Sequence, residues 1–222
     1  MLFRSQFVSN VVRSPTVSRW LPSIRQLTLH SWRDIISTDG HMRIASRVFM
    51  HQLGGRFPNL EELVLRGQDW DTRECSIPPR MFILLSAFAS VQTLLLEDVR
   101  FPSSGTMRCT ITALPSLTDL RILRVTWPVS RGIRPLLGTR KSQFLNKIRR
   151  FELVDLKGHC AEEMLGWLPV TSLGTSLVDL QIDSTALTNG SELWEFIGPS
   201  VTRLVTDFWP DREELPGDST LH

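Results

Sequence analysis

Four neighbouring residues, His159, Cys160, Glu162 and Glu163, carry the side chains most capable of chemistry in this sequence. A thiol beside an imidazole can act as a nucleophile that is activated by a base. Consecutive residues of a helix point in different directions, however, whereas a catalytic pair has to converge. Acidic residues near the start of a helix are also stabilised by the helix dipole. We therefore interpret the cluster as the acidic beginning of a helix, and nucleophilic catalysis is the less favoured alternative.

The rest of the sequence lacks the spacings that common catalytic and cofactor sites require. There is no GxGxxG, HExxH or GxSxG pattern, and Gly138–Ser142 lacks the upstream glycine of a phosphate-binding loop. The other histidines and the cysteines are scattered without metal-ligand spacing. The sequence therefore predicts a protein that is not an enzyme, with no catalytic residues, no cofactor and no metal.

A short hydrophobic pattern recurs along the chain and predicts the elements that must position any site. Its apolar residues are separated first by two variable residues and then by one. Copies begin at Ile24, Leu60, Val91, Leu117, Ile148, Leu177 and, in degenerate form, Val201. Because side chains alternate along a strand, the last two apolar residues of each copy face one core. The pattern predicts parallel strands near residues 27, 63, 94, 120, 151 and 180, with Leu63, Leu94, Phe151 and Leu180 buried.

The segments between these strands have the spacing of short helices. Apolar residues recur at helical intervals in 161–168, 44–49 and 193–197. The uncharged run from Met81 to Leu96 is short for a membrane span and is interpreted as a buried helix followed by a strand. Strands that alternate with helices favour an α/β fold with a parallel sheet.

The repeat resembles leucine-rich repeats, of the long and irregular kind that follows the F-box in many fungal F-box proteins. The stretches Phe57–Leu65 (FPNLEELVL), Val91–Phe101 (VQTLLLEDVRF) and Leu114–Ile122 (LPSLTDLRI) carry this resemblance. It implies a horseshoe-shaped solenoid with a parallel β-sheet on its concave face and short helices outside. It also implies a substrate-recognition element and a ubiquitin-ligase adaptor role, although no F-box pattern is visible in this sequence.

The length of 222 residues and the 41% hydrophobic content suit one folded array. We expect an N-terminal capping helix in residues 1–19, about seven irregular repeats in 20–209 and a flexible acidic tail in 210–222. Three widely spaced cysteines favour a reducing compartment, so a cytoplasmic or nuclear location is predicted. The first 33 residues are rich in Arg and Ser and lack acids, which makes mitochondrial import the alternative.

Charge is segregated along the chain. Residues 1–151 hold 22 Lys and Arg against 10 Asp and Glu, whereas residues 152–222 hold 3 against 13. Between Arg121 and Arg150 there are nine basic residues and no acidic one. Sequence order is spatial order in a stacked array, so we expect a positive band followed by a negative C-terminal third.

The concave wall is the predicted binding surface. Exposed strand positions and the basic band supply the predicted partner-binding residues, which are Val64, Arg66, Leu95, Glu97, Arg121, Leu123, Arg134, Arg140, Lys141 and Glu152. An apolar patch with a charged rim suits a protein partner, and the band suits one with an acidic surface.

Two alternatives remain at this stage. The basic band 121–150 could bind an anionic polymer such as RNA by counterion release, but stacking aromatic residues are sparse there, which disfavours nucleic acid. Arg121 and Glu152 could equally form a cross-strand pair without a role in binding. No membrane partner is expected, and the sequence does not set the oligomeric state.

Overall fold

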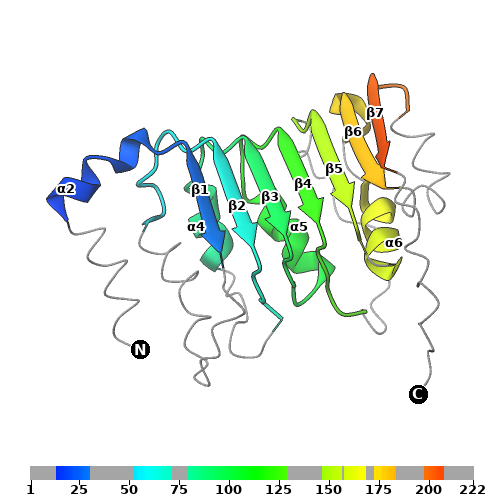
Figure 1. Cartoon of the computed structure of the whole chain (residues 1–222), viewed down its shortest axis with the longest axis horizontal. Coiled ribbons are helices and arrows are strands. Elements are labelled where there is room, and N and C mark those ends of the chain that lie inside the picture. The colour runs from blue at the N-terminus through cyan, green and yellow to red at the C-terminus, as the bar shows by residue number, and fades with distance from the viewer. Residues whose placement is uncertain are drawn as a thin grey trace, which may run out of the picture.

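The computed structural model describes residues 14–30, 53–71, 80–129, 147–156, 158–168, 173–183 and 198–207. These residues form an α/β structure built on one open sheet with short helices (Figure 1). The strands are β1 (Gln26–His30), β2 (Glu62–Arg66), β3 (Thr93–Glu97), β4 (Asp119–Leu123), β5 (Arg150–Val154), β6 (Asp179–Asp183) and β7 (Arg203–Asp207). The helices are α2 (Pro15–Ser18), the 3-10 helix η1 (Leu21–Ser23), α4 (Arg80–Ser86), α5 (Ser104–Thr112), α6 (Gly158–Trp167) and α7 (Leu173–Ser176).

The seven strands lie side by side in sequence order, and every neighbouring pair is parallel. The recurring hydrophobic pattern predicted six of these strands within about one residue, and the degenerate copy that begins at Val201 forms the seventh. The strands pair in one constant register, so residues at the same position of the pattern are direct neighbours. Parallel pairing requires each connection to cross back to the end of the sheet where the previous strand began, and the long segments between the strands, which include α4, α5 and α6, make these crossovers.

The second and fourth residues of the strands form one face of the sheet, and this face is the core. Leu63, Leu94, Phe151 and Leu180 are all buried there, as the pattern predicted. They join a continuous cluster that includes Met107 and other residues of the helices. Alternation then places the first, third and fifth strand residues on the opposite face.

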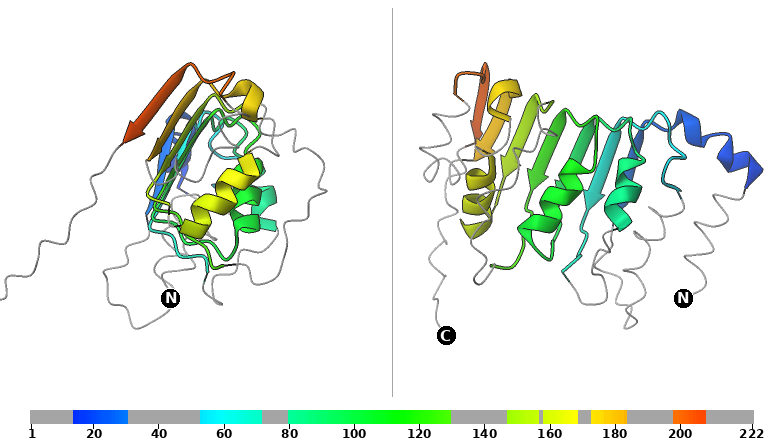
Figure 2. Two further views of the ribbon diagram at one scale, coloured as in Figure 1. Left: turned by 90° about the vertical axis from the view of Figure 1, so that its right-hand side faces the viewer. Right: turned by 180° about the vertical axis from the view of Figure 1, so that it is seen from behind.

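Helices α4, α5 and α6 lie together on the core side of the sheet, as the two side views show (Figure 2). The helical spacing in 161–168 and the run after Met81 predicted α6 and α4. The predicted helices in 44–49 and 193–197 lie outside the described residues. No described helix is long and apolar enough to cross a membrane, in keeping with the interpretation of residues 81–96.

Four of the strands end in a turn with the same backbone conformation. The residue after β2, β3, β4 and β5 has a positive φ of 52° to 64°, at Gly67, Asp98, Arg124 and Asp155. Only Gly67 adopts this left-handed conformation without steric cost. Behind the first turn, Gln68 is buried and its side-chain amide donates to the carbonyls of Leu29 and Arg66 at 3.1 and 3.2 Å. The turn is therefore tied to the preceding strand.

The two ends of the chain are described only in part. Within the predicted capping segment 1–19, α2 is a single turn whose N-cap Ser14 accepts from the Val17 N–H at 3.4 Å, and Val17 packs against the core. Residues 1–13 and the predicted tail 210–222 lie outside the described residues.

Candidate functional site

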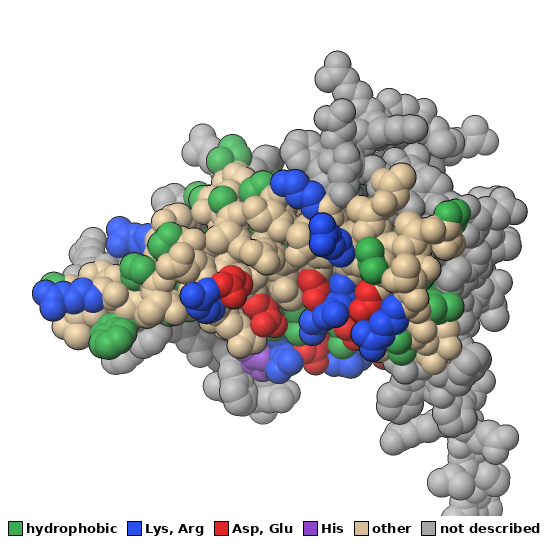
Figure 3. All heavy atoms as spheres, turned by 90° about the horizontal axis from the view of Figure 1, so that it is seen from above, with side chains coloured by type: hydrophobic (Ala, Val, Ile, Leu, Met, Phe, Trp, Pro, Cys, Tyr) green, Lys and Arg blue, Asp and Glu red, His purple; other side chains and the backbone are tan. Residues whose placement is uncertain are grey.

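The face of the sheet away from α4, α5 and α6 gathers most of the predicted binding residues. We name it the charged face and define it by the first, third and fifth residues of the seven strands. The four strands from β2 to β5 place Arg66, Glu97, Arg121 and Glu152 on it. Seen from above, acidic and basic side chains are interspersed across the middle of the molecule (Figure 3).

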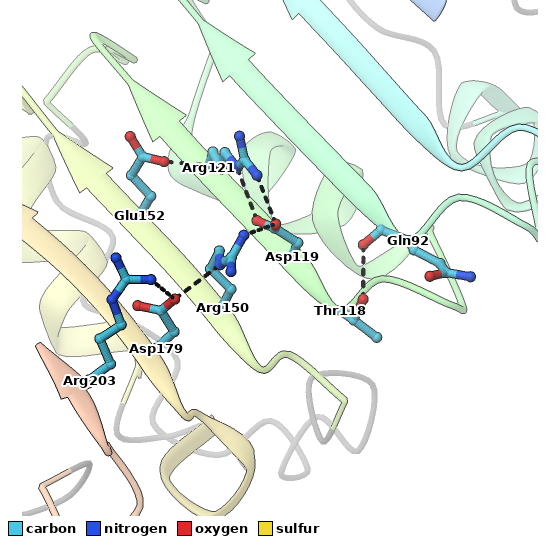
Figure 4. Close-up of polar contacts among 8 residues, drawn as sticks. All are labelled: Gln92, Thr118, Asp119, Arg121, Arg150, Glu152, Asp179 and Arg203. Carbon is cyan, nitrogen blue, oxygen red and sulfur yellow. Dashed lines mark hydrogen bonds and ion pairs between the residues drawn. The ribbon is translucent and has the colours of Figure 1, made fainter. Parts of the chain in front are cut away.

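A row of alternating charge crosses the last four strands at their first residues. Asp119, Arg150, Asp179 and Arg203 are direct register neighbours on β4, β5, β6 and β7. Arg150 lies between two acids, with Nη1 3.5 Å from Asp119 Oδ2 and Nε 3.1 Å from Asp179 Oδ2 (Figure 4). Arg203 Nη1 reaches the same Asp179 oxygen at 3.2 Å. We name these four residues the charge row.

Arg121 extends the charge row toward the centre of the face. Its guanidinium makes two hydrogen bonds to Asp119, at 3.0 and 3.2 Å, and Nε lies 3.8 Å from Glu152 Oε2. The hydrogen bond with Asp119 raises the pKa of Arg121. Arg121 and Glu152 are therefore a cross-strand pair, as one interpretation of the sequence held, but Asp119 on the same strand is the closer partner.

A second ion cluster lies where β2, β3 and β4 end. Glu97 accepts from Arg66 at 2.6 Å and from Arg124 at 2.8 Å, and Arg124 also bonds Asp98 at 2.7 Å. The hydrogen bond to Asp98 raises the pKa of Arg124. Arg66 and Glu97 were predicted partner-binding residues, whereas Arg124 was predicted only as part of the basic band and Asp98 was not predicted, because both lie just beyond the strands. Each follows the last apolar residue of its copy by two positions, so the spacing places them side by side, but the pattern does not encode the left-handed turn that they form.

The predicted apolar patch is smaller than expected. Leu95 and Leu123 are partly exposed on the charged face. Val64 is only 3% exposed, so the expectation that it is an exposed strand position is wrong. It lies outside the continuous core cluster, and the alternation that assigned it to the charged face does not determine how much solvent reaches it.

Much of the predicted basic band falls outside the described residues, including Arg134, Arg140 and Lys141. Among its described members, Arg121, Arg124 and Arg150 are ion-paired with acids. Asp119 and Asp179 hold the same position in their copies of the hydrophobic pattern as Arg150, so the sequence alone places these acids beside Arg150 on the adjacent strands. The described part of the band is therefore a mixed rather than a purely positive surface.

The His159–Cys160 pair is close but is not arranged as a nucleophile and a base. His159 Nε2 lies 3.3 Å from Cys160 Sγ and 2.8 Å from the carbonyl oxygen of Trp127. A carbonyl oxygen only accepts hydrogen bonds, so Nε2 carries a proton and donates a hydrogen bond to the Trp127 carbonyl. The nitrogen that faces the thiol therefore cannot take the thiol proton, and Cys160 is completely buried.

This geometry predicts slow chemistry at Cys160. When the folded protein is treated with iodoacetamide, we expect the exposed Cys109 to be alkylated first. Cys160 should react about two orders of magnitude more slowly, because iodoacetamide reaches its buried thiol only when the structure around it opens locally. Peptide mass spectrometry over a time course measures both rates. Equal rates in protein that remains folded would restore the nucleophile interpretation.

Glu163 has a structural partner that the sequence did not indicate. Its Oε2 accepts from the indole N–H of Trp127 at 2.9 Å, and the Arg108 guanidinium lies over the Trp167 ring at 5.4 Å. Burial lowers the pKa of Arg108, while the charge of Glu163 acts in the opposite direction. These contacts join α5 and α6 to the turn after β4.

No cluster of three or more metal-ligating side chains occurs among the residues that the structure describes. No protein-family model matches the sequence, and no curated protein matches it either.

Proposed function

We propose that this chain is a protein-interaction module of the leucine-rich-repeat type, which binds a partner through the charged face. One observation carries the proposal: a parallel sheet has helices packed on one face and solvent-exposed charged residues on the other. Parallel sheets of doubly wound and barrel folds have both faces covered. Stacked-repeat proteins instead use an extended sheet surface for binding.

The leucine-rich-repeat assignment is supported by equivalent positions along the chain. In each strand from β2 to β6 the second and fourth residues are buried, and the four turns after β2 to β5 share a left-handed residue. Just before the strands, the carbonyl of one residue accepts hydrogen bonds from two consecutive N–H groups at the start of the next strand. The Arg25 carbonyl, for example, accepts from the N–H groups of Glu61 and Glu62. These repeated features support a solenoid, and the resemblance to the repeats of fungal F-box proteins is the basis for proposing a substrate-recognition role and a link to ubiquitin ligation.

A protein is a better partner for this face than RNA. Three of the described arginines of the predicted band, Arg121, Arg124 and Arg150, are already bound to carboxylates, so fewer counterions would be released on binding phosphate. Leu95 and Leu123 add apolar surface beside charged groups, which resembles the composition of protein interfaces. The three scattered cysteines support the proposal that the module works in the cytoplasm or nucleus, with mitochondria as the alternative.

Site-specific photo-crosslinking in cells tests this function. A photoreactive residue replaces Leu95 or Leu123 on the charged face and, in matched controls, the exposed Ile83 of α4 or Glu162 of α6. We expect both face positions to crosslink the same protein, and the helix positions to crosslink it about tenfold less or not at all. The proposal is contradicted when the helix positions capture that protein equally well, or when RNA is the main product.

A further inference from the structure

The two outer strands of the sheet are covered to different extents. On β1, Leu27 and Leu29 pack against the core, and so does Val17 of α2. On β7, the core-side residue Leu204 is 49% exposed. The residues at the same register position of β2 to β6 are at most 1% exposed, namely Leu63, Leu94, Leu120, Phe151 and Leu180. β7 is the outermost described strand at this end of the sheet (Figure 1), and its large aliphatic side chain Leu204 is left in solvent.

The backbone of β7 also presents hydrogen-bonding groups at this end. The Arg203 N–H donates to the Val178 carbonyl on the β6 side at 3.1 Å. Backbone groups alternate in direction along a strand, so the N–H and C=O groups of Leu204 and Thr206 point away from β6. Among the described strands, β7 pairs with β6 alone. An exposed strand edge of this kind is a template for a further strand.

The charge row indicates which side chain a further strand should place beside β7. Arg150 has an acid on each side, Asp119 and Asp179, whereas the described neighbour of Arg203 is Asp179 on one side. The Arg203 side chain is 66% exposed. The alternation would continue if the next strand placed a carboxylate opposite Arg203, on the side away from β6.

β7 itself supplies that carboxylate. When two β7 strands pair antiparallel about Val205, Arg203 of each copy lies opposite Asp207 of the other. Leu204 lies opposite Thr206, and these two residues carry the outward backbone groups, so they form the hydrogen-bonded pairs. Arg203 and Asp207 then fall at the non-hydrogen-bonded pairs, where opposing side chains are closest. The arrangement is self-complementary, as a two-fold interface requires.

We propose that two copies of this chain associate edge to edge through antiparallel pairing of their β7 strands, forming one continuous sheet. Leu204 of each copy is then covered where the two β7 strands meet. Arg203 lies between Asp179 of its own copy and Asp207 of the other copy. A head-to-tail arrangement of β7 on β1 is disfavoured, because parallel register places the uncharged Gln26 opposite Arg203. The pairing uses the β7 edge, including Arg203 and Asp207 at the end of the charged face, and does not use Leu95 or Leu123 in the middle of that face.

The dimer is expected to be weak. Five-residue strands that pair at one edge bury less than the roughly 1,200 Å² of a standard interface. We therefore expect a Kd on the order of micromolar or above. Sedimentation velocity of the full chain over a concentration range that brackets this value should show reversible dimers.

Charge reversal distinguishes this dimer from other associations. Arg203→Glu and Asp207→Arg each place like charges opposite one another, so each variant alone should weaken dimerisation by about tenfold or more. An equimolar mixture of the two variants restores both opposite-charge pairs and should dimerise again, which also shows that the two variants are folded. Arg25→Glu, a matched reversal of an exposed arginine at the β1 end, should leave the dimer unchanged.

A backbone variant keeps the test independent of charge. Thr206→Pro removes an outward N–H but none of the bonds to β6, and proline is tolerated on a strand edge that faces solvent. It should retain the circular dichroism of the wild type and remain monomeric. A wild-type chain that stays monomeric at millimolar concentration overturns the proposal. So does a dimer that is insensitive to these β7 variants, or one that grows into head-to-tail polymers.

Discussion

Leu94→Ala is expected to lower the free energy of unfolding by about 2–5 kcal/mol, the cost of deleting a fully buried leucine and leaving a cavity. Leu94 is 0% exposed and lies in the middle of the sheet, with Leu63 and Leu120 at its register on either side. Rigid neighbours on both sides limit the collapse of the cavity, which favours the upper part of that range. Urea unfolding followed by circular dichroism measures the change.

The adjacent residue provides a matched control. Leu95 has the same side chain on the same strand but lies on the charged face and is partly exposed. We expect Leu95→Ala to cost less than about 1 kcal/mol. Equal losses at the two positions, or a larger loss at Leu95, would show that β3 has the opposite face in the core.

The sheet was the most predictable part of the structure, because burial imposes a strict alternation on each strand. A shift of one residue would expose Leu94 and Leu96 and bury Leu95 and Glu97, so the positions of the leucines determine the register. Even the degenerate copy at Val201 formed β7, since β6 supplies a template for its backbone.

Helix α5 was missed because its local sequence disfavours a helix. It contains Gly105 and three threonines, all of which have low helix propensity. Tertiary packing compensates, because Met107 and Ile111 are buried in the core. Within the helix, the hydroxyl of the buried Thr110 donates to the carbonyl of Thr106 at 3.0 Å. Ser103 also caps the first turn by accepting from the Thr106 N–H at 3.1 Å. A pattern of apolar residues alone does not register these polar contacts.

The charged face was predicted in part. Equivalent strand positions were enough to pair Arg150 with Asp119 and Asp179 before the structure was known. The same register would have added Arg203, which was missed because the seventh copy of the pattern is degenerate. Contacts made by turn residues, such as Arg124 with Asp98, depend on a left-handed backbone that the pattern does not encode.

Loss of binding through the charged face is the second large effect that we expect. The double variant Leu95→Glu, Leu123→Lys removes the two partly exposed leucines without changing the net charge. Each new charge lies beside an opposite one, since Leu95 neighbours Arg121 and Leu123 neighbours Glu97 in register. The fold should therefore tolerate the variant. A partner that packs against the leucines would instead have to bury two charges, which costs about 2 kcal/mol or more.

The most direct test is the Kd of the protein that crosslinks through Leu95 and Leu123, measured by titration calorimetry against this double variant. The matched control is Ile83→Glu, Ser86→Lys on α4, which makes the same change in charge at exposed positions on the helix side. The account predicts a Kd at least roughly 30-fold weaker for the charged-face variant and no change for the control. An unchanged Kd for the charged-face variant, with weakened binding by the α4 variant, would contradict it.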